Sequence, residues 1–347
     1  MMNPITGTLN PHVAAQVADE NASASAEAMA SPLRRGCPSA DYTHPTEYGP
    51  GELLFAKGGT DMDISYEEIV EAVQDVAKTL GEKKNILIVP PDFTRAHSMS
   101  GKVTKALYDH YGTAVKDILP ALGSHVPVTI SEKDEMFKGI PHDLFRVHDW
   151  RTDVETIGEV PGEYINQLCD QISEPYPVQV NKMLLDGGYD AIFSVGQAVL
   201  TMMLTLTSLI FHPHLHPHLH RHLKPHPFLD IQVVPHEVAG MANHTKNILV
   251  GTGGKEAIDQ SHFLGAAYGM ERIMGRGQNP VRSVYDKAFQ DTILGSMPFI
   301  WIQTVVSPRA ERSKGLAIRG LFIGDGTRAF TEAAKLSVQV HYTPLLF

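Results

Sequence analysis

Short apolar runs that each end in a polar or glycine-containing loop recur along this chain, and this rhythm constrains its fold more than any other feature. The clearest cases are residues 86–89 before 90–95, 118–122 before 123–125, and 191–195 before 196–197. A stretch with helical spacing, 102–111, separates the first two runs, which gives the order strand, helix, strand. The sequence therefore predicts an α/β fold. Because ligands bind beyond the carboxyl ends of strands in open α/β sheets, we expect the polar loops to share one site.

Ordered structure is expected to begin at Ser65, which can form a capping box with Glu68 at the start of an amphipathic helix that Gly81 ends. Further along, we interpret residues 248–250 as a fourth strand, followed by a glycine-rich loop, 251–255, and a helical pattern. That loop fits two hypotheses equally. It is a plain turn, or its backbone N–H groups cradle a phosphate at the start of a helix.

The predicted organisation has three parts. Residues 1–50 lack apolar periodicity and are predicted to be a disordered or loosely packed tail, and residues 51–290 form the principal α/β domain. Two further apolar runs, 299–306 and 316–323, are followed by a helical pattern over 329–336. We therefore expect residues 291–347 to begin a second α/β domain.

Residues 198–232 interrupt the rhythm, and we interpret them as an insertion. An apolar run is followed by a tract, 212–227, in which histidine alternates with proline and leucine and which holds seven of the 18 histidines. A metal-buffering role is one hypothesis. Alternating Pro and Leu cannot fix a coordination polyhedron, however, which favours a low-complexity segment.

The composition excludes several classes of protein. A formal net charge of −10 leaves no general basic field for nucleic acid or an anionic membrane. The longest apolar run, 198–211, is too short to span a bilayer, and no signal-peptide pattern opens the chain. Two cysteines, Cys37 and Cys169, cannot form a disulfide framework. We expect a cytoplasmic protein that acts on a small molecule.

Six dispersed polar residues carry the candidate chemistry: Asp92, Arg95, His125, His236, Lys246 and His262. Taken singly, a loop histidine is more often a surface group than a catalyst, and Arg95 could merely pair with Asp92. Together they supply a guanidinium for a carboxylate, imidazoles that titrate near neutral pH, and an amine. The set favours redox or proton chemistry on a small anionic substrate.

Four motifs in this order resemble lactate racemases of the nickel-pincer-nucleotide type. They are Asp92-Phe93-Thr94-Arg95, Ala121-Leu122-Gly123-Ser124-His125, Pro235-His236-x-x-Ala239-Gly240, and Lys246 with His262 sixteen positions later. The similarity spans about residues 82–340, interrupted at 198–232. It implies an isomerase, a racemase or epimerase of a small 2-hydroxy acid, which works by reversible hydride transfer to a nickel-pincer nucleotide. Proteins of cofactor biosynthesis would then be partners.

The resemblance also implies roles on the substrate side. His125 and His236 would be the acid/base pair, one for each enantiomer, while Arg95 would bind the substrate carboxylate and Asp92 would assist there by orienting the site. Hydride transfer suits this substrate because the Cα proton of a 2-hydroxy acid is weakly acidic beside the carboxylate. One histidine takes the hydroxyl proton as the hydride leaves, and the resulting 2-keto acid can take the hydride back on its other face.

On the cofactor side, the resemblance implies that Lys246 forms a covalent thioamide link, that Thr94 contacts the cofactor, and that His262 is the protein ligand of nickel. Residues 241–245 replace a glycine-rich stretch of the family, and its Tyr-Gln-x-x-Lys motif is absent, which indicates a divergent, C-terminally truncated branch. Two alternatives follow. The chain is a catalytically inactive homologue, or it is a metal-binding protein that uses the histidine-rich tract.

Overall fold

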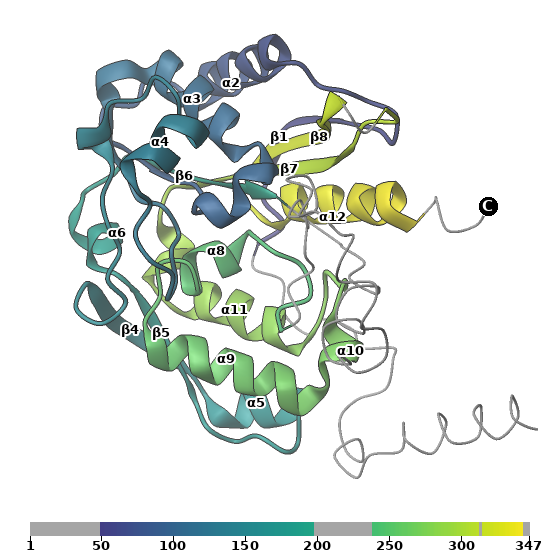
Figure 1. Cartoon of the computed structure of the whole chain (residues 1–347). Helices are drawn as coiled ribbons and strands as arrows, with labels where there is room; N and C mark the ends of the chain where they lie inside the picture. The colour runs from purple at the N-terminus through teal and green to yellow at the C-terminus, as the bar shows by residue number, and fades with distance from the viewer. Residues whose placement is uncertain (1–48, 198–237, 312–313, 343–347) are drawn as a thin grey trace, which may run out of the picture.

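The computed structural model describes residues 49–197, 238–311 and 314–342 and has a mixed α/β fold (Figure 1). Its elements are β1 (Leu53–Gly58), α2 (Tyr66–Leu80), β2 (Ile86–Val89), η2 (Phe93–Ser98), α3 (Ser100–Tyr111), η3 (Gly112–Ala114), β3 (Val115–Ile118), α4 (Ile130–Met136), η4 (His142–Leu144), β4 (Val154–Val160), α5 (Gly162–Leu168), β5 (Tyr176–Asn181), α6 (Lys182–Asp186), β6 (Ala191–Gln197), α8 (Thr245–Leu249), α9 (Lys255–Tyr268), α10 (Met270–Ile273), α11 (Pro280–Asp291), η6 (Ile293–Ser296), β7 (Phe299–Pro308), β8 (Leu316–Gly324) and α12 (Thr327–Tyr342).

A six-stranded sheet in the order β1-β8-β7-β6-β2-β3 forms the centre of the fold. The pairs β3–β2, β2–β6 and β6–β7 are parallel, whereas β8 pairs antiparallel with β7 and with β1. Every residue of β2 and of β6 is buried, as expected for parallel strands that are covered on both faces. The strands β4 and β5 form a separate antiparallel pair.

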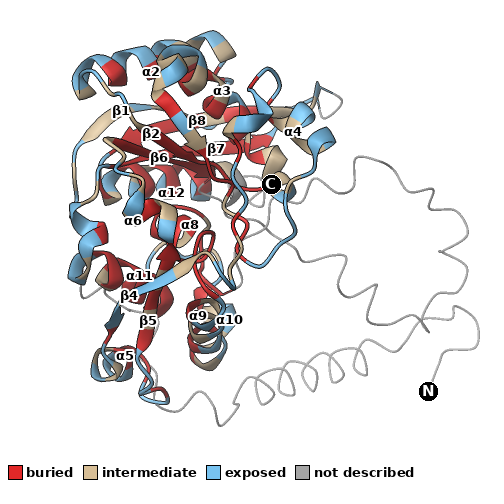
Figure 2. Ribbon diagram, turned by 90° about the vertical axis from the view of Figure 1, so that its left-hand side faces the viewer, coloured by how far each residue is buried: buried red, intermediate tan, exposed pale blue. Residues whose placement is uncertain are grey.

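Helices cover both faces of this sheet, and the red strands of Figure 2 lie between them. On one face α2 and α3 pack through a cluster that includes Ile69, Val103 and Ile88. On the other face α8, α9 and α11 pack with the β4–β5 pair around Trp301, and α12 packs on β7 and β8 through Phe330. The cavity of the candidate active site lies where the carboxyl ends of β2 and β6 meet this second layer of helices.

Several predicted elements are confirmed. The Ser65–Glu68 capping box opens α2 and Gly81 caps its C-terminus, while α3 covers the predicted 102–111 stretch. The strand over 191–195 is β6, the helix over 256–268 is α9, and the helix over 329–336 is α12.

Two predicted strands were wrong in position or type. Residues 248–250 are not a strand, because 245–249 form the helix α8, whose buried residues give an apolar run that looks the same in a helix and a strand. The run 118–122 is not itself a strand either, since β3 ends at Ile118. The strand β3 lies at the edge of the sheet and exposes Lys116, so polar residues interrupt its apolar pattern.

The stretch after residue 291 also differs from the expectation of a second α/β domain. β7 pairs with β6 and β8 pairs with β1, so both strands belong to the same sheet as β2 and β3. The described residues of 291–342 therefore complete the first sheet. Residues 1–48 of the predicted tail and the whole insertion, 198–232, lie outside the described residues.

Within the described part of the chain, no helix has both the length and the apolar character needed to cross a bilayer.

Candidate active site

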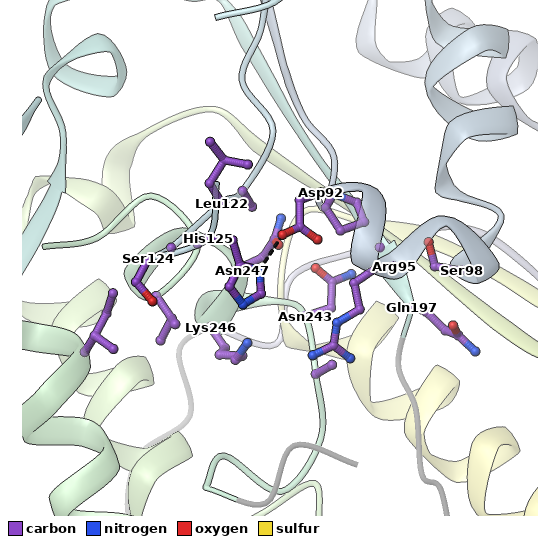
Figure 3. Close-up of a pocket in the computed structure, with 18 of the residues that line it drawn as sticks. Asp92, Arg95, Ser98, Leu122, Ser124, His125, Gln197, Asn243, Lys246 and Asn247 are labelled. Carbon is purple, nitrogen blue, oxygen red and sulfur yellow. Dashed lines mark hydrogen bonds and ion pairs between the residues drawn. The ribbon is translucent and has the colours of Figure 1, made fainter. Parts of the chain in front are cut away.

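A cavity of about 280 Å³ opens at the carboxyl ends of β2 and β6 (Figure 3). The structure brings five of the predicted site residues to its lining: Asp92, Arg95, His125, Lys246 and His262. They come from four places in the chain, namely the start of η2, the loop after β3, α8 and α9. Thr94 does not line the cavity, and His236 lies outside the described residues.

Asp92 connects the loop after β2 to His125. Its Oδ1 accepts hydrogen bonds from the backbone N–H of Thr94 at 3.1 Å and from the Thr94 hydroxyl at 2.5 Å, so Asp92 caps η2. Its Oδ2 lies 2.5 Å from Nδ1 of His125. Both oxygens of this 4% exposed carboxylate are engaged, so Asp92 is placed to orient His125, and Thr94 supports it.

The Asp92–His125 pair shifts both pKa values toward the charged forms. Burial raises the pKa of Asp92, but hydrogen bonds from His125 and Thr94 outweigh it, and the pKa lies below its usual value. The hydrogen bond to Asp92 raises the pKa of His125, against partial burial and the positive charges of Arg95 and Lys246. The imidazole is thereby a stronger base than an isolated histidine.

These shifts predict that Asp92→Asn destabilises the fold most between about pH 4 and pH 6.5. The lowered pKa of Asp92 adds stability above its unfolded value, which is lost as the pH falls through the folded value. The raised pKa of His125 adds stability below its unfolded value, which is lost as the pH rises through the folded value. Urea unfolding at about pH 5 and about pH 9 measures the difference from wild type. A difference that does not change with pH, or an equal change in the exposed control Asp75→Asn, would contradict it.

Arg95 extends from η2 into the cavity (Figure 3). It is half-buried, and no hydrogen bond or ion pair to its guanidinium is found among the described residues, which removes the alternative that it serves only to pair with Asp92. The Arg95 guanidinium therefore offers a planar fork of hydrogen-bond donors to a carboxylate in the cavity.

The short helix α8 brings Lys246 to the cavity because its neighbour fixes the helix on the sheet. The side-chain amide of Asn247 donates to the carbonyl of Val89 at 3.1 Å and to the hydroxyl of Ser194 at 3.0 Å. Val89 is the last residue of β2 and Ser194 lies within β6, so Asn247 ties α8 to both strands. Lys246 then lies below His125 in the view of Figure 3.

Two glycines allow the loop of His125 to lie against the end of α8. Gly123 has a φ of 55°, and its N–H donates to the carbonyl of Gly251 at 2.8 Å. A Cβ on Gly251 would lie 2.5 Å from the Cβ of Ala121, closer than side chains can approach. The contact between these loops therefore requires glycine.

Side chains from elsewhere in the protein pack against the rest of the glycine-rich loop and the start of α9. His148, 3% exposed, donates from Nε2 to the carbonyl of Gly253, and the Gln179 side chain accepts from the N–H of Ala257 in the first turn of α9. A Cβ on Gly254 would meet that Gln179 side chain. These contacts favour the plain turn over the phosphate cradle.

His262 lines the cavity from α9 with a defined tautomer. Its Nδ1 lies 2.6 Å from the carbonyl oxygen of Ile258, and because a carbonyl only accepts, Nδ1 carries the hydrogen. The lone pair is then on Nε2, the arrangement common for metal-binding histidines.

Lys246 and His262, the two residues that the resemblance assigns to holding the nickel-pincer nucleotide, line the same cavity. Among the described residues, no group of three or more His, Cys, Asp or Glu side chains could hold a metal ion unaided. The resemblance calls for only one protein ligand, with the other donors supplied by a cofactor attached to lysine. Lys246 and the Nε2 of His262 would meet that requirement in one cavity.

Several lining residues were missed by the sequence reasoning. Asn243 and Asn247 lie beside Lys246, and Ser98 lies at the end of η2. No spacing or composition marked them, since single Asn and Ser residues are common in loops. Gln197 was not missed, because residues 196–197 were among the polar loops expected to share the site, and the structure places Gln197 at the end of β6.

No family model and no curated protein matches this chain. Among solved structures, it is similar to the lactate racemase apoprotein from Thermoanaerobacterium thermosaccharolyticum, with a TM-score of 0.52 and 18% sequence identity. The match covers 80% of this chain and 56% of that one, so the chain spans little more than half the length of its structural neighbour. At this identity the likeness concerns the fold, and it confirms that this chain has an α/β fold of the lactate racemase type.

Proposed function

We propose that the cavity binds a small 2-hydroxy acid and interconverts its stereoisomers at Cα, which makes the protein a racemase or epimerase. The observation that carries this proposal is the Asp92–His125 pair, which faces the same cavity as Arg95, Lys246 and His262. The lactate-racemase-like fold supports it independently.

Arg95 would bind the substrate carboxylate through two parallel hydrogen bonds and so fix the orientation of Cα. With Nδ1 hydrogen-bonded to Asp92, His125 has Nε2 available to take the proton of the substrate hydroxyl. Asp92 would stabilise the resulting imidazolium, as the raised pKa of His125 already indicates. The substrate would become a 2-keto acid, and a second base on its other face would return a proton to the oxygen when the hydride adds to that face.

A nickel-pincer nucleotide would supply the acceptor and donor of the Cα hydride, held through Lys246 and ligated by His262. His236 stays a prediction for the second base, on the opposite face of the substrate.

Intact-mass analysis tests the cofactor assignment. The full chain is produced together with the proteins of cofactor biosynthesis, and an authentic lactate racemase is produced in parallel as a positive control. We expect one adduct on the full chain, which a digest of the same sample locates on the peptide that contains Lys246, and no adduct in Lys246→Arg. An unmodified chain beside a modified control, or an adduct on another lysine, would contradict the assignment.

Metal analysis separates this proposal from a metal-binding protein. Nickel bound with the cofactor should survive deletion of residues 212–227 and be lost in His262→Ala. The opposite pattern would assign the metal to the histidine-rich tract.

A further inference from the structure

A fully buried arginine holds the turn that leads into α8. Arg282, on α11, is 2% exposed. Its Nη1 donates to the carbonyl of Asn243 at 3.1 Å and its Nη2 to the carbonyl of Met241 at 2.7 Å. A single rigid fork thus binds two carbonyls of the segment directly before Lys246.

This turn has a backbone that requires such support. Asn243 and His244 have φ values of 69° and 57°, so two consecutive non-glycine residues occupy the left-handed region. Side chains disfavour this region unless their surroundings impose it. The His244 ring lies 4.4 Å from the Trp301 ring and 5.3 Å from the Phe330 ring, centroid to centroid, so aromatic packing also supports the turn.

A hydroxyl relay connects the guanidinium to a buried carboxylate. Nη1 of Arg282 also donates to the Thr245 hydroxyl at 3.0 Å, and that hydroxyl donates to Oδ1 of Asp286 at 2.9 Å. Asp286 lies one turn after Arg282 on α11 and is 4% exposed. Burial lowers the pKa of Arg282, and the nearby Asp286 carboxylate acts against this effect.

We propose that Arg282 is the positioning residue for Lys246, because it holds the strained Asn243-His244 turn in the one conformation that directs the amine into the cavity. The inference rests on the proposed function only in taking Lys246 as the residue that reacts. Arg282 itself does not line the cavity and touches no reacting group.

Hydrogen exchange on the cofactor-free full chain tests the proposal. The reporters are the N–H of Asn247, bonded to the carbonyl of His244, and the N–H of Val250, bonded to the carbonyl of Lys246. In Arg282→Met we expect both to exchange about 10-fold to 100-fold faster, since hydrogen bonds from a charged donor are lost. The N–H of Ile69 in α2 should keep its rate. Lys287→Met, on the same helix, is the matched control.

Amine labelling of the same samples gives a readout of Lys246 itself. An acetylating reagent is applied, and the modification of Lys246 is compared with that of Lys84, which lies far from the site on an exposed loop. Release of the turn should change the Lys246-to-Lys84 ratio about 10-fold in Arg282→Met. Arg282→Lys keeps the charge but cannot hold both carbonyls, so it should give a smaller change in the same direction.

Two outcomes would overturn the proposal: wild-type reporters and wild-type labelling in a folded Arg282→Met, or a uniform change at every amide and lysine. If Arg282→Met does not fold, the same two measurements are made on Thr245→Val. This variant breaks the relay to Asp286 without removing the guanidinium. Neither readout uses cofactor or substrate, so a failed adduct or racemisation assay leaves this test intact.

Discussion

Replacing Asp92 by Asn is expected to slow racemisation by the cofactor-loaded protein about 10³-fold to 10⁴-fold. An asparagine amide can donate to Nδ1 of His125, which would place the imidazole hydrogen on Nε2 and leave no lone pair facing the substrate. It also removes the charge that raises the pKa of His125. The rate is measured from each enantiomer by chiral chromatography, with samples matched for cofactor load by intact mass.

The exposed variant Asp75→Asn, which also removes one carboxylate, should keep the wild-type rate. Wild-type turnover in a loaded Asp92→Asn protein would remove the Asp92–His125 pair from the mechanism. A rate loss explained entirely by a loss of folded protein would have the same consequence.

Replacing Arg95 by Lys is expected to lower kcat/KM about 10²-fold although the positive charge is kept. An ammonium cannot bind a carboxylate through two parallel hydrogen bonds, and a substrate that moves by about 1 Å leaves the reactive geometry. Arg95→Met, which also loses the charge, should fall further.

The control for this series is Arg151→Lys, an exposed arginine outside the cavity. Steady-state rates over a range of substrate concentrations separate kcat from KM. If Arg95→Met keeps the wild-type KM and kcat, the carboxylate is bound elsewhere.

The sequence was most informative where one local pattern has one structural meaning. The Ser65–Glu68 box and Gly81 set the ends of α2, and the buried strands β2 and β6 follow from continuous apolar runs. Since the carboxyl ends of parallel strands meet at one edge, the loops after them could be predicted to share a site. Asp92 and His125, 33 positions apart, do meet there.

Prediction failed where the pattern depends on neighbours far along the chain. The edge strand β3 carries Lys116 and Asp117 because one side of it has no strand partner, and this hid the strand. The end of α8 is buried, so residues 248–250 form a continuous apolar run. Such a short run shows no helical periodicity and looks like a buried strand. β7 and β8 joined the first sheet through pairing with β6 and β1, which strand propensity alone does not specify.

The support of the site was also beyond sequence reasoning. Arg282 stands in an amphipathic helix where an arginine ordinarily faces water, and only the fold shows that it is buried against Met241 and Asn243. The role of Asp92 at the substrate stays a prediction, and its partner His125 became clear only when both of its oxygens were located.

Racemisation of a single enantiomer tests the central claim most directly. The full chain, loaded with cofactor and verified by its mass, is incubated with L-lactate and, separately, with larger L-2-hydroxy acids, and the products are resolved on a chiral column. The account predicts that at least one of these acids reaches an equal mixture of enantiomers, and that this conversion is lost in His125→Ala. A loaded and folded protein that leaves every one of them unchanged would contradict it.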